Sequence, residues 1–106
     1  MSICEFNIVD GVGIQNDSLV LMITDHLDWT SIDEETHMNM LVKKINAYLD
    51  FIEEKQYQNT YPNIAFKKFI IDIRCKYEMP AKCVHYLERA NEKIKALNTQ
   101  IRFQAN

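Results

Sequence analysis

The spacing of apolar residues changes along this chain, and that change limits its possible folds more than any other feature. Between residues 31 and 52, apolar side chains recur every three or four positions, the period of an α-helix with one buried face. Residues between them, such as Lys43, Lys44 and Glu53, are expected on the solvent side. The pattern predicts a long amphipathic helix whose buried stripe comprises Met38, Leu41, Val42, Ile45, Tyr48, Leu49 and Ile52.

A capping-box spacing predicts where this helix begins. Ser31 precedes Glu34 by three residues, so its hydroxyl can accept a hydrogen bond from the Glu34 backbone while the Glu34 carboxylate reaches back. Asp33, Glu34 and Glu35 then occupy the first turn, where the partial positive charge of the backbone amides favours carboxylates. The helix is expected to start at Ser31.

The residues before this helix have the pattern of a β-hairpin. Residues 6–14 alternate between apolar and other side chains, residues 15–18 favour a turn, and residues 19–23 are continuously apolar. A continuous apolar run is typical of a strand that is covered on both faces. The second strand of the hairpin is therefore expected to be central in the sheet.

The second half of the chain has a strand, a helix and a final strand. Residues 56–63 break the helical period and predict a loop, and residues 69–77 alternate as a strand. Pro80 fits the first turn of a helix that ends near residue 98, before a short strand at residues 101–103. One face of the 69–77 strand, expected to be buried, comprises Phe69, Ile71, Ile73, Cys75 and Tyr77. The other, expected mostly in water, comprises Ile70, Asp72, Arg74 and Lys76.

The predicted order of elements is β-β-α-β-α-β in a single α+β domain that spans residues 1–106. Helices with one apolar stripe and strands with one polar face favour a two-layer sandwich, in which both helices lie on one face of a four-stranded sheet. The opposite face of the sheet is then partly bare. Tyr57, Tyr61 and Phe66 are candidates to cover that face or to form a homodimer contact.

Charge is distributed unevenly along the chain. The net charge is -3, yet residues 1–60 contain 11 acids and 3 bases (3 - 11 = -8), and residues 61–106 contain 9 bases and 4 acids (9 - 4 = +5). Such a division suits an acidic and a basic patch within one fold, or complementary patches on two copies. A nucleic-acid binder would be basic overall, so no nucleic-acid partner is expected.

Other features argue for a cytoplasmic protein with no cofactor. Cys4, Cys75 and Cys83 lack the C-x-x-C spacing of zinc or redox sites and are expected to be reduced thiols, with Cys75 and Cys83 packed in the core. The longest apolar run, residues 19–23, is far too short to span a membrane, and no secretory signal is evident. No phosphate-binding loop or nucleophile elbow is present in the sequence.

Several segments together resemble a family of small, uncharacterised bacterial proteins. They are a DHLDW motif (residues 25–29) between hairpin and helix, His37, KINAYLDFIE (residues 44–53), Tyr61-Pro62 and IDIRCKYEMP (residues 71–80). The resemblance covers nearly the whole chain and implies a cytoplasmic domain with no assigned activity or ligand. The resemblance implies that members often carry a glycine just after the first helix, where this chain has Glu54-Lys55-Gln56, so the helix end is expected to be longer here.

Residues 24–37 are the candidate site, because they gather Asp25, His26, Asp28, Trp29 and His37. Carboxylate and imidazole groups suit a metal site or general acid–base chemistry, although the spacing matches no established ligand motif. A structural interpretation uses Asp25 or Asp28 to hydrogen-bond the downstream backbone, folds Trp29 over the core edge with its indole N–H on a carbonyl, and leaves His37 at the surface. A patch for protein recognition is the third interpretation.

The preferred hypothesis is a non-enzymatic, protein-binding or regulatory module with an acidic surface that binds a basic partner, as an antitoxin-like or immunity protein would. Opposite charge speeds encounter, and a tryptophan can anchor the complex. One alternative is a metal-dependent hydrolase that uses Asp25, His26, Asp28 and His37, and another is a structural subunit of a larger assembly.

Overall fold

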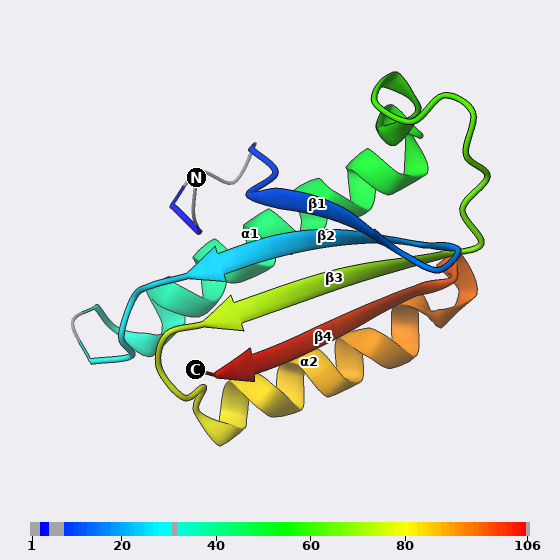
Figure 1. Ribbon diagram of the computed structural model, residues 1–106. Coiled ribbons are helices and arrows are strands. Elements are labelled where there is room, and N and C mark those ends of the chain that lie inside the picture. Colours follow the sequence, from blue (N-terminus) through cyan, green and yellow to red (C-terminus); the bar gives the residue numbers. More distant parts are fainter. Residues whose placement is uncertain (1–2, 5–7, 31, 106) are drawn as a thin grey trace.

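Figure 1 shows the computed structural model of the chain, which describes residues 3–4, 8–30 and 32–105. The elements follow the predicted order β-β-α-β-α-β, with two short 3-10 helices added after α1 and α2. They are β1 (Gly11–Gln15), β2 (Ser18–Asp25), α1 (Glu34–Glu53), η1 (Gln56–Asn59), β3 (Lys68–Cys75), α2 (Ala81–Ile94), η2 (Lys95–Leu97) and β4 (Thr99–Ala105).

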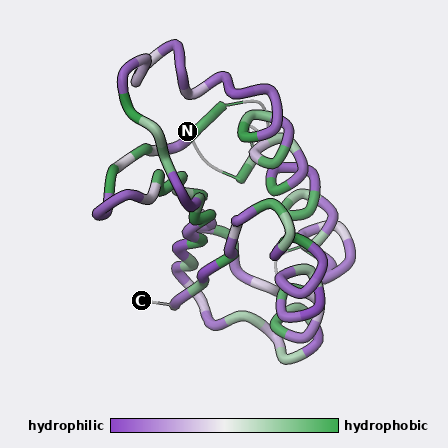
Figure 2. The backbone as a smooth tube through the Cα atoms, turned by 90° about the vertical axis from the view of Figure 1, so that its right-hand side faces the viewer, coloured by the Kyte–Doolittle hydropathy of each residue, from purple (hydrophilic) through white to green (hydrophobic). Residues whose placement is uncertain are grey.

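The four strands form one mixed sheet in the order β1-β2-β3-β4. β1 is antiparallel to β2, while β2, β3 and β4 are mutually parallel, and β2 lies in the interior of the sheet as predicted. The crossovers β2-α1-β3 and β3-α2-β4 step in the same direction across the sheet, so two right-handed connections place both helices on one face. Figure 1 and the view turned by 90° in Figure 2 show this arrangement. The predicted two-layer fold is confirmed.

The core lies between this face of the sheet and the two helices. Of the predicted α1 stripe, Leu41, Ile45, Tyr48 and Ile52 are buried, and Met38, Val42 and Leu49 are half-buried. The apolar residues of β2 and β3 that point towards the helices are buried. Tyr77 is an exception, because β3 ends at Cys75 and Tyr77 lies beyond it, exposed. The buried core includes Leu19, Leu21, Ile23, Leu41, Ile45, Tyr48, Ile52, Phe69, Ile71, Ile73, Cys75, Cys83, Leu87, Ile94 and Ile101.

The predicted starts of β1 and α1 are wrong. β1 begins at Gly11, because residues 8–10 leave the strand and Asp10 instead uses its side chain to bind Thr24. Helix α1 is capped by Asp33, whose carboxylate accepts from the Thr36 backbone N–H at 2.8 Å. Ser31, the predicted cap, lies outside the described residues, as do residues 5–7 of the predicted first strand.

The second face of the sheet, away from the helices, has a buried carboxylate in its middle. Asp72, predicted to be in water, is fully buried because Arg74 and Arg102 close over it, with N–O distances of 3.1 and 3.2 Å. Arg102 also donates to the Gln15 side chain on β1 at 3.3 Å. Long polar side chains thus cover this face, in place of the aromatic cover that the sequence suggested.

The aromatic residues of the long connection lie on the helix side instead. Tyr57 contacts Phe51 of α1, Phe66 and Phe69, with ring centroids 5.2–6.5 Å apart, and Phe66 also meets Tyr61. Phe69 belongs to the buried face of β3. The cluster therefore closes the end of the core where α1 finishes.

The outer edge of β4 is occupied by a side chain from α2. Asn91 accepts from the Ile101 backbone N–H at 2.6 Å and donates to the Ile101 carbonyl at 3.0 Å. An amide side chain can make both bonds that a neighbouring strand would make at this residue. Asn91 consequently fixes α2 to the edge of the sheet.

Candidate functional site

Asp25 ends β2 and lies inside the protein. Its side chain is buried, one carboxylate oxygen accepts from the Leu27 backbone N–H at 3.2 Å, and the other lies 2.6 Å from His37 Nε2. A carboxylate can only accept, so the proton of this bond is on Nε2. The bond to the downstream backbone at Leu27 is the one predicted for this residue.

His37 is completely buried, so the prediction of a surface residue is wrong. It is four residues before Leu41, and side chains at this separation lie on the same face of a helix. The Trp29 ring covers the imidazole in a parallel stack, with centroids 3.6 Å apart and planes at 13°. His37 is held between a carboxylate and an indole.

Two nitrogens of this cluster have no hydrogen-bond partner among the residues that the structure describes. They are Nδ1 of His37 and Nε1 of Trp29, and both atoms are buried. The predicted fold of Trp29 over the core edge is confirmed, whereas the predicted bond from its indole N–H to a carbonyl is not found. Unpaired buried nitrogens destabilise this cluster, which the stacking and the Asp25–His37 bond must offset.

Cys75 lies opposite Asp25 in the register of β2 and β3. Burial raises the pKa of its thiol to about 11, and the negative charge of Asp25 adds to this effect. The group is therefore a neutral thiol at physiological pH, and a neutral thiol is a poor nucleophile. The predicted packing of Cys75 and Cys83 in the core is confirmed.

His26 and Asp28 do not join the buried cluster. His26 is exposed, and Asp28 accepts from the backbone N–H and hydroxyl of Thr30, at 3.0 and 3.2 Å. The structure thus brings together three of the five predicted residues, Asp25, Trp29 and His37. Within the described ranges, no group of three or more histidine, cysteine, aspartate or glutamate residues is placed to hold a metal ion.

A second buried ion pair, which the sequence analysis missed, joins α1 to the residues before β1. Lys44 donates to Asp10 at 2.6 Å, with both side chains almost completely buried. The Tyr48 hydroxyl accepts from the Asp10 backbone N–H and donates to the Met22 carbonyl, and burial raises its pKa. Lys44 was predicted to be in water. Its position three residues after Leu41 and four before Tyr48 was the signal that it shares their buried face.

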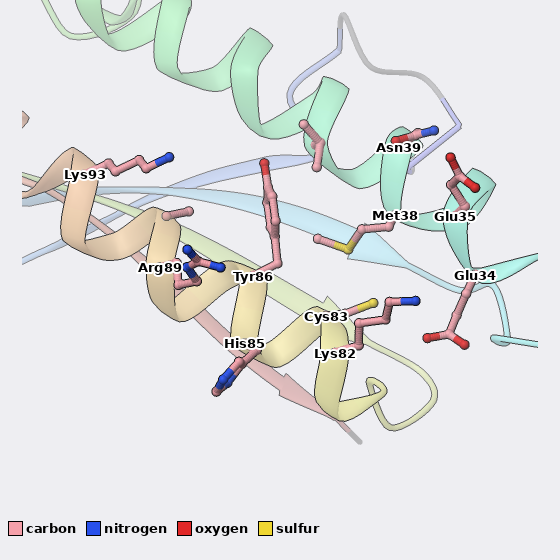
Figure 3. Close-up of a pocket in the computed structure, with 12 residues that line it drawn as sticks. Glu34, Glu35, Met38, Asn39, Lys82, Cys83, His85, Tyr86, Arg89 and Lys93 are labelled. Atoms are coloured by element: carbon pink, nitrogen blue, oxygen red, sulfur yellow. The ribbon is translucent and has the colours of Figure 1, made fainter.

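An open groove lies between α1 and α2, on the side of the helices that faces away from the sheet (Figure 3). Its volume is about 850 Å³. Met38 and Val42 of α1 and Cys83, Tyr86 and Ala90 of α2 give it an apolar lining. Tyr86 is 46% exposed, and its side chain points from α2 towards α1.

The two walls of this groove carry opposite charge. The α1 wall has Glu34 and Glu35, and the α2 wall has Lys82, His85, Arg89 and Lys93. No salt bridge crosses the groove in the part of the chain that the structure describes. The sequence showed the charge difference between the two halves of the chain, but it did not show that the helices present it across one groove.

Comparison with known proteins gives a family but no activity. The profile of a family described as a family of unknown function, DUF6572, matches residues 1–106. No curated protein matches the chain, and no solved structure matches it. In the described ranges, no helix is both long enough and apolar enough to cross a membrane.

Proposed function

Because the chain belongs to DUF6572, a family of unknown function, we propose from its geometry alone that it is a non-enzymatic protein-binding module. The groove between α1 and α2 is the proposed binding surface. The observation that carries this proposal is its apolar lining between an acidic and a basic wall. Protein interfaces commonly combine a buried apolar centre with a charged rim.

Tyr86 supports the choice of this groove. Tyrosine is enriched among the residues that contribute most to binding, because it buries a large apolar ring and keeps a polar hydroxyl. Tyr86 is 46% exposed and lies beside half-buried Met38, Val42 and Ala90. A partner side chain could therefore cover apolar surface that is now in contact with water.

The charge of the α1 wall supports a basic partner at that end. Asp33, Glu34 and Glu35 are exposed at the start of α1, whereas Asp25 of the predicted site is enclosed. The sequence analysis placed the acidic surface around Asp25, Asp28 and Trp29, and we now propose the first turn of α1 in its place. A regulatory or immunity-like role, a bacterial origin, a cytoplasmic location and the DHLDW motif as a family signature stay predictions.

The alternative of a metal-dependent hydrolase has less support. It would use Asp25, His26, Asp28 and His37 together, yet His37 is enclosed by Trp29 and Asp25 while His26 is exposed. Catalytic groups must reach a bound substrate. The groove itself contains the thiol of Cys83, whose pKa burial raises, so that this thiol is mostly neutral.

Site-specific photo-crosslinking in the native cell tests the proposal. A photoreactive phenylalanine at Tyr86 should give a discrete crosslinked protein band. The same amino acid at Tyr77, a tyrosine of similar exposure (42%) outside the groove lining, is the matched control and should not give it. Identical products from both positions, or no protein product from position 86, would reject the groove as a protein-binding surface.

A further inference from the structure

We infer that the partner in this groove is a second copy of the same chain, bound about a two-fold axis that runs along the groove. The inference rests on the proposed function and names its partner. Two features carry it: the opposite charges of the two walls, and the parallel direction of the two helices.

The direction of the helices decides which walls meet. Each helix connects two parallel strands, so α1 and α2 run in the same general direction (Figure 1). A two-fold axis parallel to the helices, in the plane between two facing copies, places α1 of one copy over α2 of the other. The acidic wall of each copy then faces the basic wall of its partner, and the contact occurs twice because the interface is isologous.

The same axis also places the first turns of the helices of both copies at the same end of the groove. Glu34 and Glu35 lie in the first turn of α1, and Lys82 lies in the first turn of α2, at the same end of the groove (Figure 3). A rotation about an axis along the groove does not exchange its two ends. Glu34 and Glu35 of one copy therefore meet Lys82 of the other, with Arg89 farther along the same wall.

The other in-plane axis, perpendicular to the helices, gives the opposite result. It places α1 over α1 and α2 over α2 with the helix directions reversed, so the basic walls, with Lys82, Arg89 and Lys93 along α2, would face each other. Glu34 and Glu35 of the two copies would lie at opposite ends of the groove, where neither meets a basic wall. Like charges in an interface are strongly unfavourable. The distribution of charge therefore selects one symmetric arrangement, in which Tyr86 of each copy covers the apolar lining of the other.

Charge reversal tests this arrangement by sedimentation equilibrium. The first variant, Glu34→Lys/Glu35→Lys, makes both walls basic, and the second, Lys82→Glu/Arg89→Glu, makes both acidic. Each variant alone should dissociate at least about tenfold more readily than the wild type, because like walls then meet. An equimolar mixture of the two should recover a heterodimer, since every basic wall can again meet an acidic one.

Matched controls separate wall contacts from changes in total charge. Glu53→Lys/Glu54→Lys and Lys67→Glu/Lys68→Glu make the same changes in charge at exposed positions outside the groove lining, and both should leave the dimer unchanged. Circular dichroism of each variant checks that it is folded. The recovery of a heterodimer on mixing also shows that both reversed chains keep their fold.

The outcomes distinguish this inference from the proposed function. A wild-type chain that stays monomeric at high concentration, or a dimer that resists both reversals, overturns the second-copy arrangement. If position 86 then crosslinks to a different protein, the groove remains a protein-binding surface with another occupant. If position 86 crosslinks to nothing, both proposals fail.

Discussion

Asp25 and His37 depend on each other, because neither side chain is in contact with water. Removing one partner of a buried pair leaves the other charged or polar group without compensation, which costs about 3 kcal/mol or more. The variant His37→Ala should therefore lower the free energy of unfolding by about 3 kcal/mol in urea denaturation. It also removes the ring on which Trp29 stacks.

The exposed His26 provides a matched control for this prediction. His26→Ala removes an imidazole from the adjacent loop and should change the free energy of unfolding by less than about 0.5 kcal/mol. Similar losses for the two alanine variants would mean that the Asp25–His37 bond contributes little to stability.

Cys75 should make stability depend on alkaline pH. Its pKa in the folded chain is about 11, above the ordinary value of 9.0. A thiol whose pKa is higher in the folded than in the unfolded chain stabilises the fold fully at a pH below the unfolded pKa. This stabilisation is lost as the pH rises through the folded pKa. The free energy of unfolding should fall between about pH 9 and 11, and it should fall less steeply in Cys75→Ala. Parallel pH profiles of the two proteins would contradict this assignment.

At the scale of the elements, the end of α1 stores backbone strain in one residue. Lys55 has a φ of 56°, in the left-handed region, between α1 and η1. This conformation crowds any side chain that has a Cβ. Lys55→Gly should therefore raise the free energy of unfolding by about 0.5–1 kcal/mol, as measured by urea denaturation.

Alanine at the same position serves as the control. Lys55→Ala keeps the Cβ, so it should bring little of the gain that glycine brings. If alanine stabilised the protein as much as glycine, the gain in stability would come from removing the lysine side chain and not from relieving the backbone conformation.

Asn91 should determine how firmly α2 and β4 hold together. Asn91→Ala removes both bonds to Ile101 and should cost about 2 kcal/mol, whereas Asn91→Asp keeps an acceptor for the N–H and should cost less. Hydrogen exchange at the Ile101 amide should accelerate most in the alanine variant. Unchanged exchange there would show that the edge is protected in another way.

At the scale of the whole molecule, the Asp10–Lys44 pair joins the start of the chain to its longest helix. The two residues are 34 positions apart, and both side chains are buried. Lys44→Ala should reduce the free energy of unfolding by about 3 kcal/mol and speed hydrogen exchange at Thr24, whose amide binds Asp10. Lys67→Ala, at an exposed position before β3, should have little effect. If Lys44→Ala and its control lowered the free energy of unfolding equally, the Asp10–Lys44 pair would not be what joins these two segments.

Apolar periodicity was enough to predict the order of elements and the two-layer arrangement, because core-facing positions repeat with the period of each element. It failed where a polar side chain occupies a core-facing position. His37 and Lys44 lie on the buried stripe of α1, and each is compensated by a carboxylate from a distant part of the chain. Sequence spacing within one helix does not reveal such a partner.

The candidate site shows the same limit. The sequence placed Asp25, Asp28 and Trp29 in one loop, and the local bonds from the two aspartates follow from that proximity. The groove depends instead on how far apart two helices lie on the sheet. That distance is set by the strands beneath them, and no local pattern records it.

The Asn91 side chain also has a consequence for solubility during synthesis and storage. A strand from a misfolded neighbour that approached β4 would find the Ile101 amide and carbonyl already engaged. At Ile101, therefore, no backbone hydrogen bond is left for such a strand, which hinders fibre growth by strand addition at this edge.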